Sequence, residues 1–125
     1  MTEGSMSRSQ RISVATPWLS PTESTVLTRF AEQVRAQYGG RVNRIALFGS
    51  RARREGHEES DLDVAVILAD VDQALRRALI DLATDLFLET EMRISPLVLS
   101  QDEFDTLLRL GRGVAIAIRD EGIDL

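Results

Sequence analysis

Apolar side chains recur every three to four residues between positions 20 and 40, which is the spacing of one buried helix face. Residues 20–23 (SPTE) place a serine before the helix, a proline at its first position and a glutamate at its third, which is the capping-box pattern. Gly39 and Gly40 can take the left-handed conformation that ends a helix. The pattern therefore predicts an amphipathic helix over residues 21–38. Its apolar positions are Val26, Leu27, Phe30, Ala31, Val34 and Tyr38.

Three short apolar runs predict β-strands at residues 44–48 (RIALF), 61–68 (DLDVAVIL) and 94–99 (ISPLVL). A charged connection separates the first two runs. Pro96 has no amide hydrogen to donate to a neighbouring strand. The third strand is therefore expected at an edge of the sheet, or with a local break.

Two further helices are predicted around the third strand. Asp70 or Asp72 can cap the first, which ends near Thr90. The second begins with another capping box, residues 100–103 (SQDE), and ends at Gly111. The apolar stripe of the first consists of Leu75, Leu79, Leu82 and Leu86.

The order of elements predicts the fold class, although residues 114–125 fit either a strand or a helix by periodicity alone. Helix, strand, strand, helix, strand and helix indicate an α/β or α+β domain with a small sheet. A chain of 125 residues suffices for one compact domain. Residues 1–19 are rich in Ser and Thr without a periodic pattern, so we expect a flexible N-terminal lead before a domain over residues 20–125.

Composition removes several functions. The net charge of −5 argues against nonspecific nucleic-acid binding. The chain has no cysteine, no lysine and one histidine, which excludes a thiolate nucleophile, a Schiff base and a paired-histidine metal site. No apolar run reaches the roughly 20 residues of a membrane span, and the first residues lack a signal-peptide core. A cytoplasmic protein without membrane contact is the expectation.

Carboxylates and a glycine turn carry the remaining candidate chemistry. Asp61 and Asp63 lie two residues apart in a predicted strand and therefore share one face, on which their charges repel. Mg²⁺ neutralises such a pair and is typically bound by one or two carboxylates plus substrate phosphates. Gly49 and Ser50 end the preceding strand, where a glycine lets the backbone approach an anion and helix-terminal amides bind phosphate. Both features point to a metal-bound polyphosphate.

Each feature also has an ordinary explanation. A Gly-Ser turn commonly follows a strand, and Asp63 could be solvated on the open face of a sheet. Arg51 and Arg53, with Arg54, fit a solvated surface cluster, yet they directly follow the turn where triphosphate charge would need them. His57 is interpreted as a loop residue.

The compound pattern resembles a known family. Residues 47–53 (LFGSRAR) and 60–64 (SDLDV) are similar to the G-S-x-A-R and S-D-x-D-hydrophobic signature of minimal nucleotidyltransferases in the DNA polymerase beta superfamily. The resemblance implies a small mixed sheet flanked by helices, and a helix followed by a short strand over residues 114–125. It also implies that Gly49 and Ser50 grip a nucleoside triphosphate, while Asp61 and Asp63 bind Mg²⁺.

Two positions depart from the family pattern. Arg54 stands where the family often has glycine. Ser95 stands where the superfamily's third carboxylate is expected, and a serine neither acts as a base near neutral pH without help nor carries charge for a second metal.

The resemblance implies an enzyme that transfers a nucleoside monophosphate, with AMP from ATP as the expected group, to a hydroxyl group. Its expected partner is a HEPN-domain toxin, for which this chain would be the antitoxin. Two alternatives remain: an inactive module that neutralises its partner by contact, and a transferase acting on a small molecule.

Overall fold

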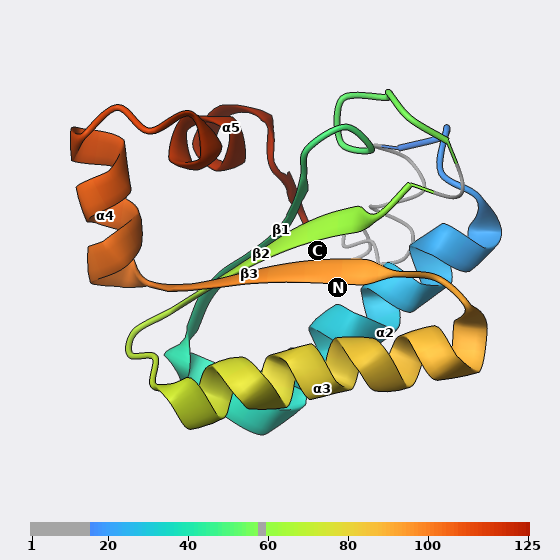
Figure 1. The fold of residues 1–125 in the computed structure, drawn as a ribbon, viewed down its shortest axis with the longest axis horizontal. Helices are drawn as coiled ribbons and strands as arrows, with labels where there is room; N and C mark the ends of the chain where they lie inside the picture. The colour runs from blue at the N-terminus through green and yellow to red at the C-terminus, as the bar shows by residue number, and fades with distance from the viewer. Residues whose placement is uncertain (1–15, 58–59) are drawn as a thin grey trace, which may run out of the picture.

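A four-stranded mixed sheet organises the computed structural model, which describes residues 16–57 and 60–125 (Figure 1). The strand order is β3-β2-β1-β4. β1 pairs antiparallel with both β2 and β4, whereas β2 and β3 are parallel and therefore need a crossover helix between them. The strands are β1 (Val42–Phe48), β2 (Leu62–Leu68), β3 (Ile94–Ser100) and β4 (Ile123–Asp124).

The first predicted helix is confirmed as α2 (Pro21–Tyr38). The Ser20 hydroxyl accepts a hydrogen bond from the Glu23 amide at 3.1 Å, and the Glu23 carboxylate accepts one from the Ser20 amide at 2.8 Å. Gly39 follows the helix with φ of 51° and opens a short 3₁₀ turn, η1 (Gly39–Arg41). The capping box and the glycine stop thus set both ends of α2.

The remaining helices are α3 (Gln73–Thr90), α4 (Gln101–Arg109) and α5 (Gly113–Glu121). Of the two predicted caps of α3, Asp72 is the one used: its side chain accepts the Leu75 amide at 2.8 Å. Ser100 and Glu103 form the second predicted capping box. The ambiguous tail is the helix α5 followed by the short strand β4, as the family resemblance implied. None of the helices in the described ranges is long and apolar enough to span a membrane.

The strands differ little from those predicted. β1 begins two residues earlier, β2 begins one residue later, at Leu62, and β3 extends to Ser100. β3 lies at an edge of the sheet, where Pro96 pairs in register with Val64. The edge position expected from Pro96 is confirmed.

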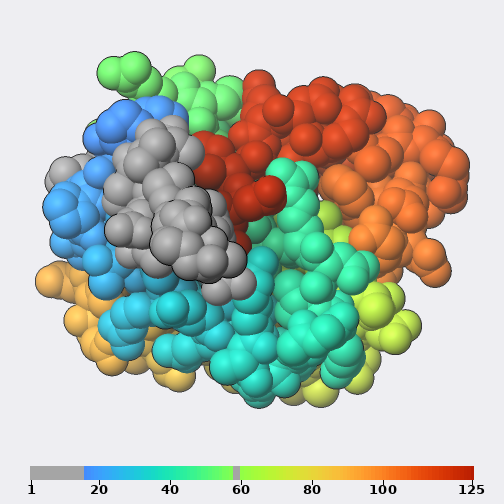
Figure 2. Space-filling view, turned by 180° about the vertical axis from the view of Figure 1, so that it is seen from behind, coloured from blue at the N-terminus to red at the C-terminus, as the bar shows by residue number. Residues whose placement is uncertain are grey.

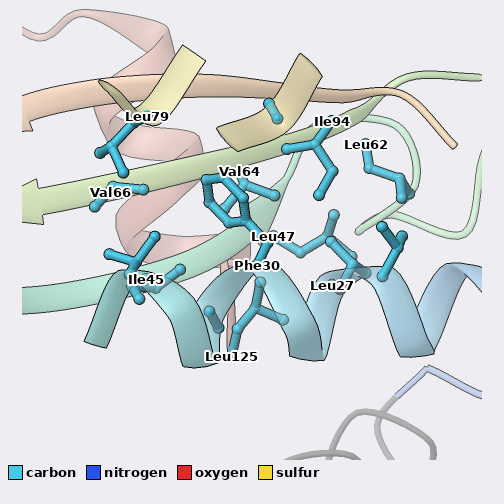
Figure 3. Close-up of a cluster of buried hydrophobic side chains, with 14 of the residues drawn as sticks. Leu27, Phe30, Ile45, Leu47, Leu62, Val64, Val66, Leu79, Ile94 and Leu125 are labelled. Atoms are coloured by element: carbon cyan, nitrogen blue, oxygen red, sulfur yellow. The ribbon is translucent and has the colours of Figure 1, made fainter. Parts of the chain in front are cut away.

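Alternating side chains of β2 face two different apolar layers. Leu62, Val64 and Val66 contribute to the cluster beneath the sheet, against α2 and α3 (Figure 3). Ala65 and Ile67 face the opposite layer, formed by α4 and α5 (Figure 1). Asp63 begins this second face, at the end of β2 next to the long β1–β2 connection.

Arg44 fastens the C-terminal elements to the sheet. Its guanidinium donates to the Asp124 carboxylate at 2.7 Å and to the carbonyls of Ile118 and Gly122 at 2.9 and 3.2 Å. The two carbonyls lie at the C-terminal end of α5, where the Ile118 carbonyl also accepts the Gly122 amide at 3.1 Å. Arg44 therefore sets where α5 lies above the sheet.

Candidate functional site

Gly49, which directly follows β1, and Asp63, the second residue of β2, are in direct contact in the fold. β1 ends at Phe48, which pairs in register with Asp63, so the next residue turns beside the aspartate. Gly49 has φ of 76°, and a Cβ built on it would lie 2.5 Å from Asp63 Oδ2. Only glycine permits both the conformation and the approach. The structure thus brings the glycine-serine turn and the carboxylate into one site.

The turn continues through residues 50–54 as hydrogen-bonded turns. The Arg53 amide donates to the Ser50 carbonyl at 3.1 Å, and the Glu55 amide donates to the same carbonyl at 2.8 Å. These residues do not continue into a helix, so the helix-terminal amides considered for phosphate binding are not found at this turn. The Ser50 carbonyl instead gathers the loop around the end of β1.

Arg51 does not have the position predicted for it. The prediction offered a triphosphate contact or a solvated surface cluster, but its side chain is 5% exposed. Arg51 Nε and Nη2 donate to the two carboxylate oxygens of Glu23 at 3.0 and 2.8 Å. The guanidinium is therefore committed to α2 and is not directed at an anion in the turn.

Asp61 and Asp63 differ in environment. Asp61 immediately precedes β2 and is about half exposed, with Arg93 Nη1 3.9 Å from Oδ1. Burial raises the pKa of Asp63, the charge of Asp61 raises it further, and Arg53 opposes both. The repulsion between the two carboxylates inferred from their spacing is thus present in the fold.

Arg53 is the arginine of this loop whose charge acts on Asp63 and whose side chain remains partly exposed to solvent. Its charge acts on Asp63, and its side chain is 39% exposed. Nε donates to Glu55 at 3.2 Å, and Nη1 lies 3.6 Å from Glu121 at the end of α5. These exposed ion pairs are weak, so Arg53 can exchange them for a bound anion.

Ser95 occupies the position beside Asp63 on the neighbouring strand. The two residues are partners in the parallel register of β2 and β3, so their side chains leave the same face of the sheet. Leu97, two residues further along β3, packs on that face with the cluster containing Ala65. Ser95 therefore lies beside Asp63 on the same face of the sheet, as the interpretation of Ser95 as a replaced carboxylate requires.

The acidic residues fit one divalent cation. Two carboxylates together with substrate phosphates are a sufficient ligand set for Mg²⁺. Across residues 16–57 and 60–125, no group of three or more His, Cys, Asp and Glu side chains could hold a metal.

Ser60 and Gly56 close the base of the long loop, a role that sequence reasoning missed. Ser60 Oγ accepts the His57 amide at 3.1 Å. Gly56 has φ of 73°, and a Cβ there would lie 2.7 Å from Ser60 Oγ and 3.3 Å from Ser50 Oγ. The serine of the S-D-x-D motif thus contacts the loop that carries the glycine-serine turn.

Arg54 adopts the backbone conformation that the family's glycine would favour. Its φ is 65°, which costs an ordinary residue about 1–2 kcal/mol. Its guanidinium lies 5.8 Å from the centre of the Trp18 ring, which recovers part of that cost. Arg54 thus replaces the glycine of the family pattern, and the backbone keeps the left-handed conformation.

Arg54→Gly should increase the free energy of unfolding by about 0.5–1 kcal/mol, because glycine takes positive φ without steric cost and loses only backbone entropy. Urea denaturation measures the change. Arg54→Ala is the matched control, since it loses the Trp18 contact and keeps the strain, and it should destabilise. Equal stabilities for the two variants would contradict the strain argument.

The sequence is similar to known nucleotidyltransferases. A family model described as a nucleotidyltransferase domain matches residues 27–123. A curated protein of Methanocaldococcus jannaschii, named "Putative protein adenylyltransferase MJ0604", is 37% identical over 83 residues. The match covers 66% of this chain and 79% of the relative.

Two solved structures share the fold. A mutant MntA-HpeT toxin-antitoxin structure matches with a TM-score of 0.50 and 20% identity, and a toxin-antitoxin structure with AMP-PNP matches with 0.51 and 22%. Each match covers 77% of this chain and 69% of the other. At this identity the likeness concerns the fold.

Proposed function

This chain belongs to the nucleotidyltransferase domain family, and we propose that it transfers AMP from ATP to a hydroxyl group of a partner protein. The single observation that carries the proposal is the contact between Gly49 and Asp63, which joins a triphosphate-binding turn to a metal-binding carboxylate. The curated relative is named for adenylyl transfer to protein, which supports ATP and a protein acceptor.

Each site residue has one proposed task. Gly49 and Ser50 hold the triphosphate through the backbone and hydroxyl of the turn. Arg53 contributes a cation beside them. Asp61 and Asp63 would hold Mg²⁺, which would supply positive charge to neutralise the phosphates. Arg51, although predicted as a nucleotide contact, is assigned to positioning because its guanidinium is buried against Glu23.

The transfer requires one bond to form and one to break. The acceptor hydroxyl oxygen attacks the α-phosphorus of ATP, the bond from that phosphorus to the bridging oxygen breaks, and pyrophosphate leaves with its electron pair. The hydroxyl proton passes to water or to a base on the partner, since Ser95 cannot take it near neutral pH. Catalysis then consists mainly of positioning and charge neutralisation.

The proposed partner is a HEPN-domain toxin, for which this chain is the antitoxin. The structural neighbours come from toxin-antitoxin structures, one of which contains AMP-PNP. Intact mass of a HEPN protein incubated with this chain, Mg²⁺ and each nucleoside triphosphate tests the proposal. A mass increase of one or more AMP groups with ATP supports it, and an unchanged mass with every nucleotide contradicts it.

Ser95 favours one alternative function. Because a hydroxyl stands in place of the third carboxylate, the domain could bind nucleotide and neutralise its partner by contact without transferring AMP. Neutralisation of the toxin by Asp63→Asn as effectively as by the wild-type chain would select this alternative over the transferase.

Ser95→Asp should raise the rate of transfer, because a third carboxylate beside Asp63 can accept the hydroxyl proton and help to hold a second metal. We expect an increase of about 10²-fold, within the usual range for general-base catalysis. Time courses of AMP incorporation measure it, with Ser95→Ala as the control at or below the wild-type rate. A Ser95→Asp rate equal to that of Ser95→Ala would show that the position does not contribute.

A further inference from the structure

The buried carboxylate of Glu23 makes hydrogen bonds with two parts of the fold, the N-terminal cap of α2 and the turn that follows β1. Oε1 accepts the Ser20 amide at 2.8 Å, which caps α2, and also accepts Arg51 Nη2 at 2.8 Å. Oε2 accepts Arg51 Nε at 3.0 Å, which completes a bidentate pair. The Glu23 side chain is 0% exposed, so water does not replace these contacts. The start of α2 and the turn after β1 are thus joined through one side chain.

Trp18 adds a second connection between the same two segments. Its indole Nε1 donates to the Arg51 carbonyl at 2.6 Å, and Arg51 Nη2 lies 3.4 Å from the Trp18 carbonyl. Figures 1 and 2 both show the chain just before α2, in blue, lying beside the 51–57 loop, in green. Arg51 is therefore held through its side chain and its carbonyl, immediately after Ser50.

We propose that Glu23, with Trp18, is a positioning residue of the nucleotide site, and that this N-terminal clamp fixes the Gly49–Ser50 turn against Asp63. The proposal rests on the proposed function for the ligand of that turn. Both residues contact Arg51, and in this proposal they act on the turn through it and not by binding the nucleotide.

The chemistry of the pair favours positioning over stability as its purpose. Burying two charges costs desolvation free energy, which their mutual attraction offsets only when the geometry is good. An apolar pair at the same contact would therefore stabilise the fold to a similar extent. A bidentate guanidinium–carboxylate pair does what an apolar contact does not: it fixes direction through two parallel hydrogen bonds. The fixed direction is passed to Ser50, one residue away, so that the turn is held in advance in the conformation proposed to bind the triphosphate.

The chain offers a matched control for Glu23. Glu103 is also the third residue of a helix with a capping-box serine, and it also pairs with an arginine, Arg76, at 2.8 Å. Glutamine is compatible with a capping box. Glu23→Gln and Glu103→Gln therefore make the same chemical change in the same local motif, and only the first touches the clamp.

The test is calorimetric titration of the full chain with Mg²⁺ and AMP-PNP, at a temperature where circular dichroism shows each variant folded. Glu23→Gln should weaken binding at least 10-fold, while Glu103→Gln stays within 2-fold of wild type. In the transfer assay Glu23→Gln should raise KM with kcat nearly unchanged, because ground state and transition state lose the same contact. Wild-type affinity and KM in folded Glu23→Gln would overturn the proposal.

Two further measurements keep the outcome decisive. If Glu23→Gln does not fold, Trp18→Phe, which removes only the indole donor, should weaken binding at least 3-fold, and unchanged affinity overturns the clamp. Hydrogen exchange without ligand should speed up at amides 51–55 in Glu23→Gln and not in Glu103→Gln. If the wild-type chain binds no nucleotide, the proposed function fails, and the clamp is then judged from hydrogen exchange alone. Faster exchange at amides 51–55 in Glu23→Gln than in Glu103→Gln supports the clamp, and equal exchange in the two variants overturns it.

Discussion

Asp63→Asn is expected to lower the rate of AMP transfer by about 10²–10³-fold, the scale on which removal of one electrostatic stabiliser acts. The amide carries no charge with which to hold Mg²⁺ beside the Gly49 turn. Asp85→Asn, which neutralises an exposed aspartate on α3, is the control and should leave the rate unchanged. Transfer by Asp63→Asn at the wild-type rate would remove Asp63 from the site.

The same substitution should raise the melting temperature of the metal-free chain at neutral pH. Burial and Asp61 raise the pKa of Asp63 in the folded state, so ionisation of this group opposes folding. Protonated Asp63 therefore contributes fully to stability at pH values below its pKa in the unfolded chain. This contribution is lost as pH rises through its higher pKa in the folded chain. Thermal melts of both chains across that range should converge at acid pH and separate above it. A lower melting temperature for Asp63→Asn at pH 7 would identify Asp63 as a structural acceptor.

Gly49→Ala should abolish detectable binding of Mg²⁺-nucleotide and destabilise the fold by about 2–4 kcal/mol, from the cost of positive φ in a non-glycine residue and the contact with Asp63. A Cβ at 2.5 Å from Asp63 Oδ2 forces the turn and the carboxylate apart. Calorimetry and urea denaturation measure the two effects.

Two other glycines separate the causes of the Gly49 effect. Gly39 has φ of 51° with no atom within 4 Å of a built Cβ, and Gly40 has neither a positive φ nor a close neighbour. Gly39→Ala should lose about 1 kcal/mol of stability and keep nucleotide binding. Gly40→Ala should change neither. If Gly39→Ala lost binding as well, the effect would come from general destabilisation and not from the approach to Asp63.

Local signals predicted most of the fold. Both capping boxes form as expected, because they depend on hydrogen bonds between residues near in sequence. Pro96 lies on an edge strand, as expected from its missing amide hydrogen. Periodicity could not assign residues 114–125, since a short apolar segment fits two periods equally well. The family resemblance identified the helix and strand there, and Arg44 holds them in place.

The candidate site was only partly predictable. Strand alternation placed Asp63 on the face that Ala65 and Ile67 continue, and family spacing brought Gly49 beside it. Arg51 was misjudged because three arginines in four residues resemble a solvated run, whereas its burial depends on Glu23, 28 residues earlier. A capping-box glutamate looks complete within its own helix, so nothing local indicates that it has a second partner.

The contact between the Trp18 indole and the Arg51 carbonyl also gives the protein an optical property. Trp18 is the only tryptophan of the chain, so ultraviolet emission excited beyond the tyrosine band comes from one ring. That ring donates to the backbone of the loop that follows Ser50, at 2.6 Å, and lies beside the Arg54 cation. Any movement of the loop alters the polarity and quenching around this single fluorophore. Nucleotide binding that moves this loop would therefore change the emission of the unlabelled protein, and the change could be followed in real time.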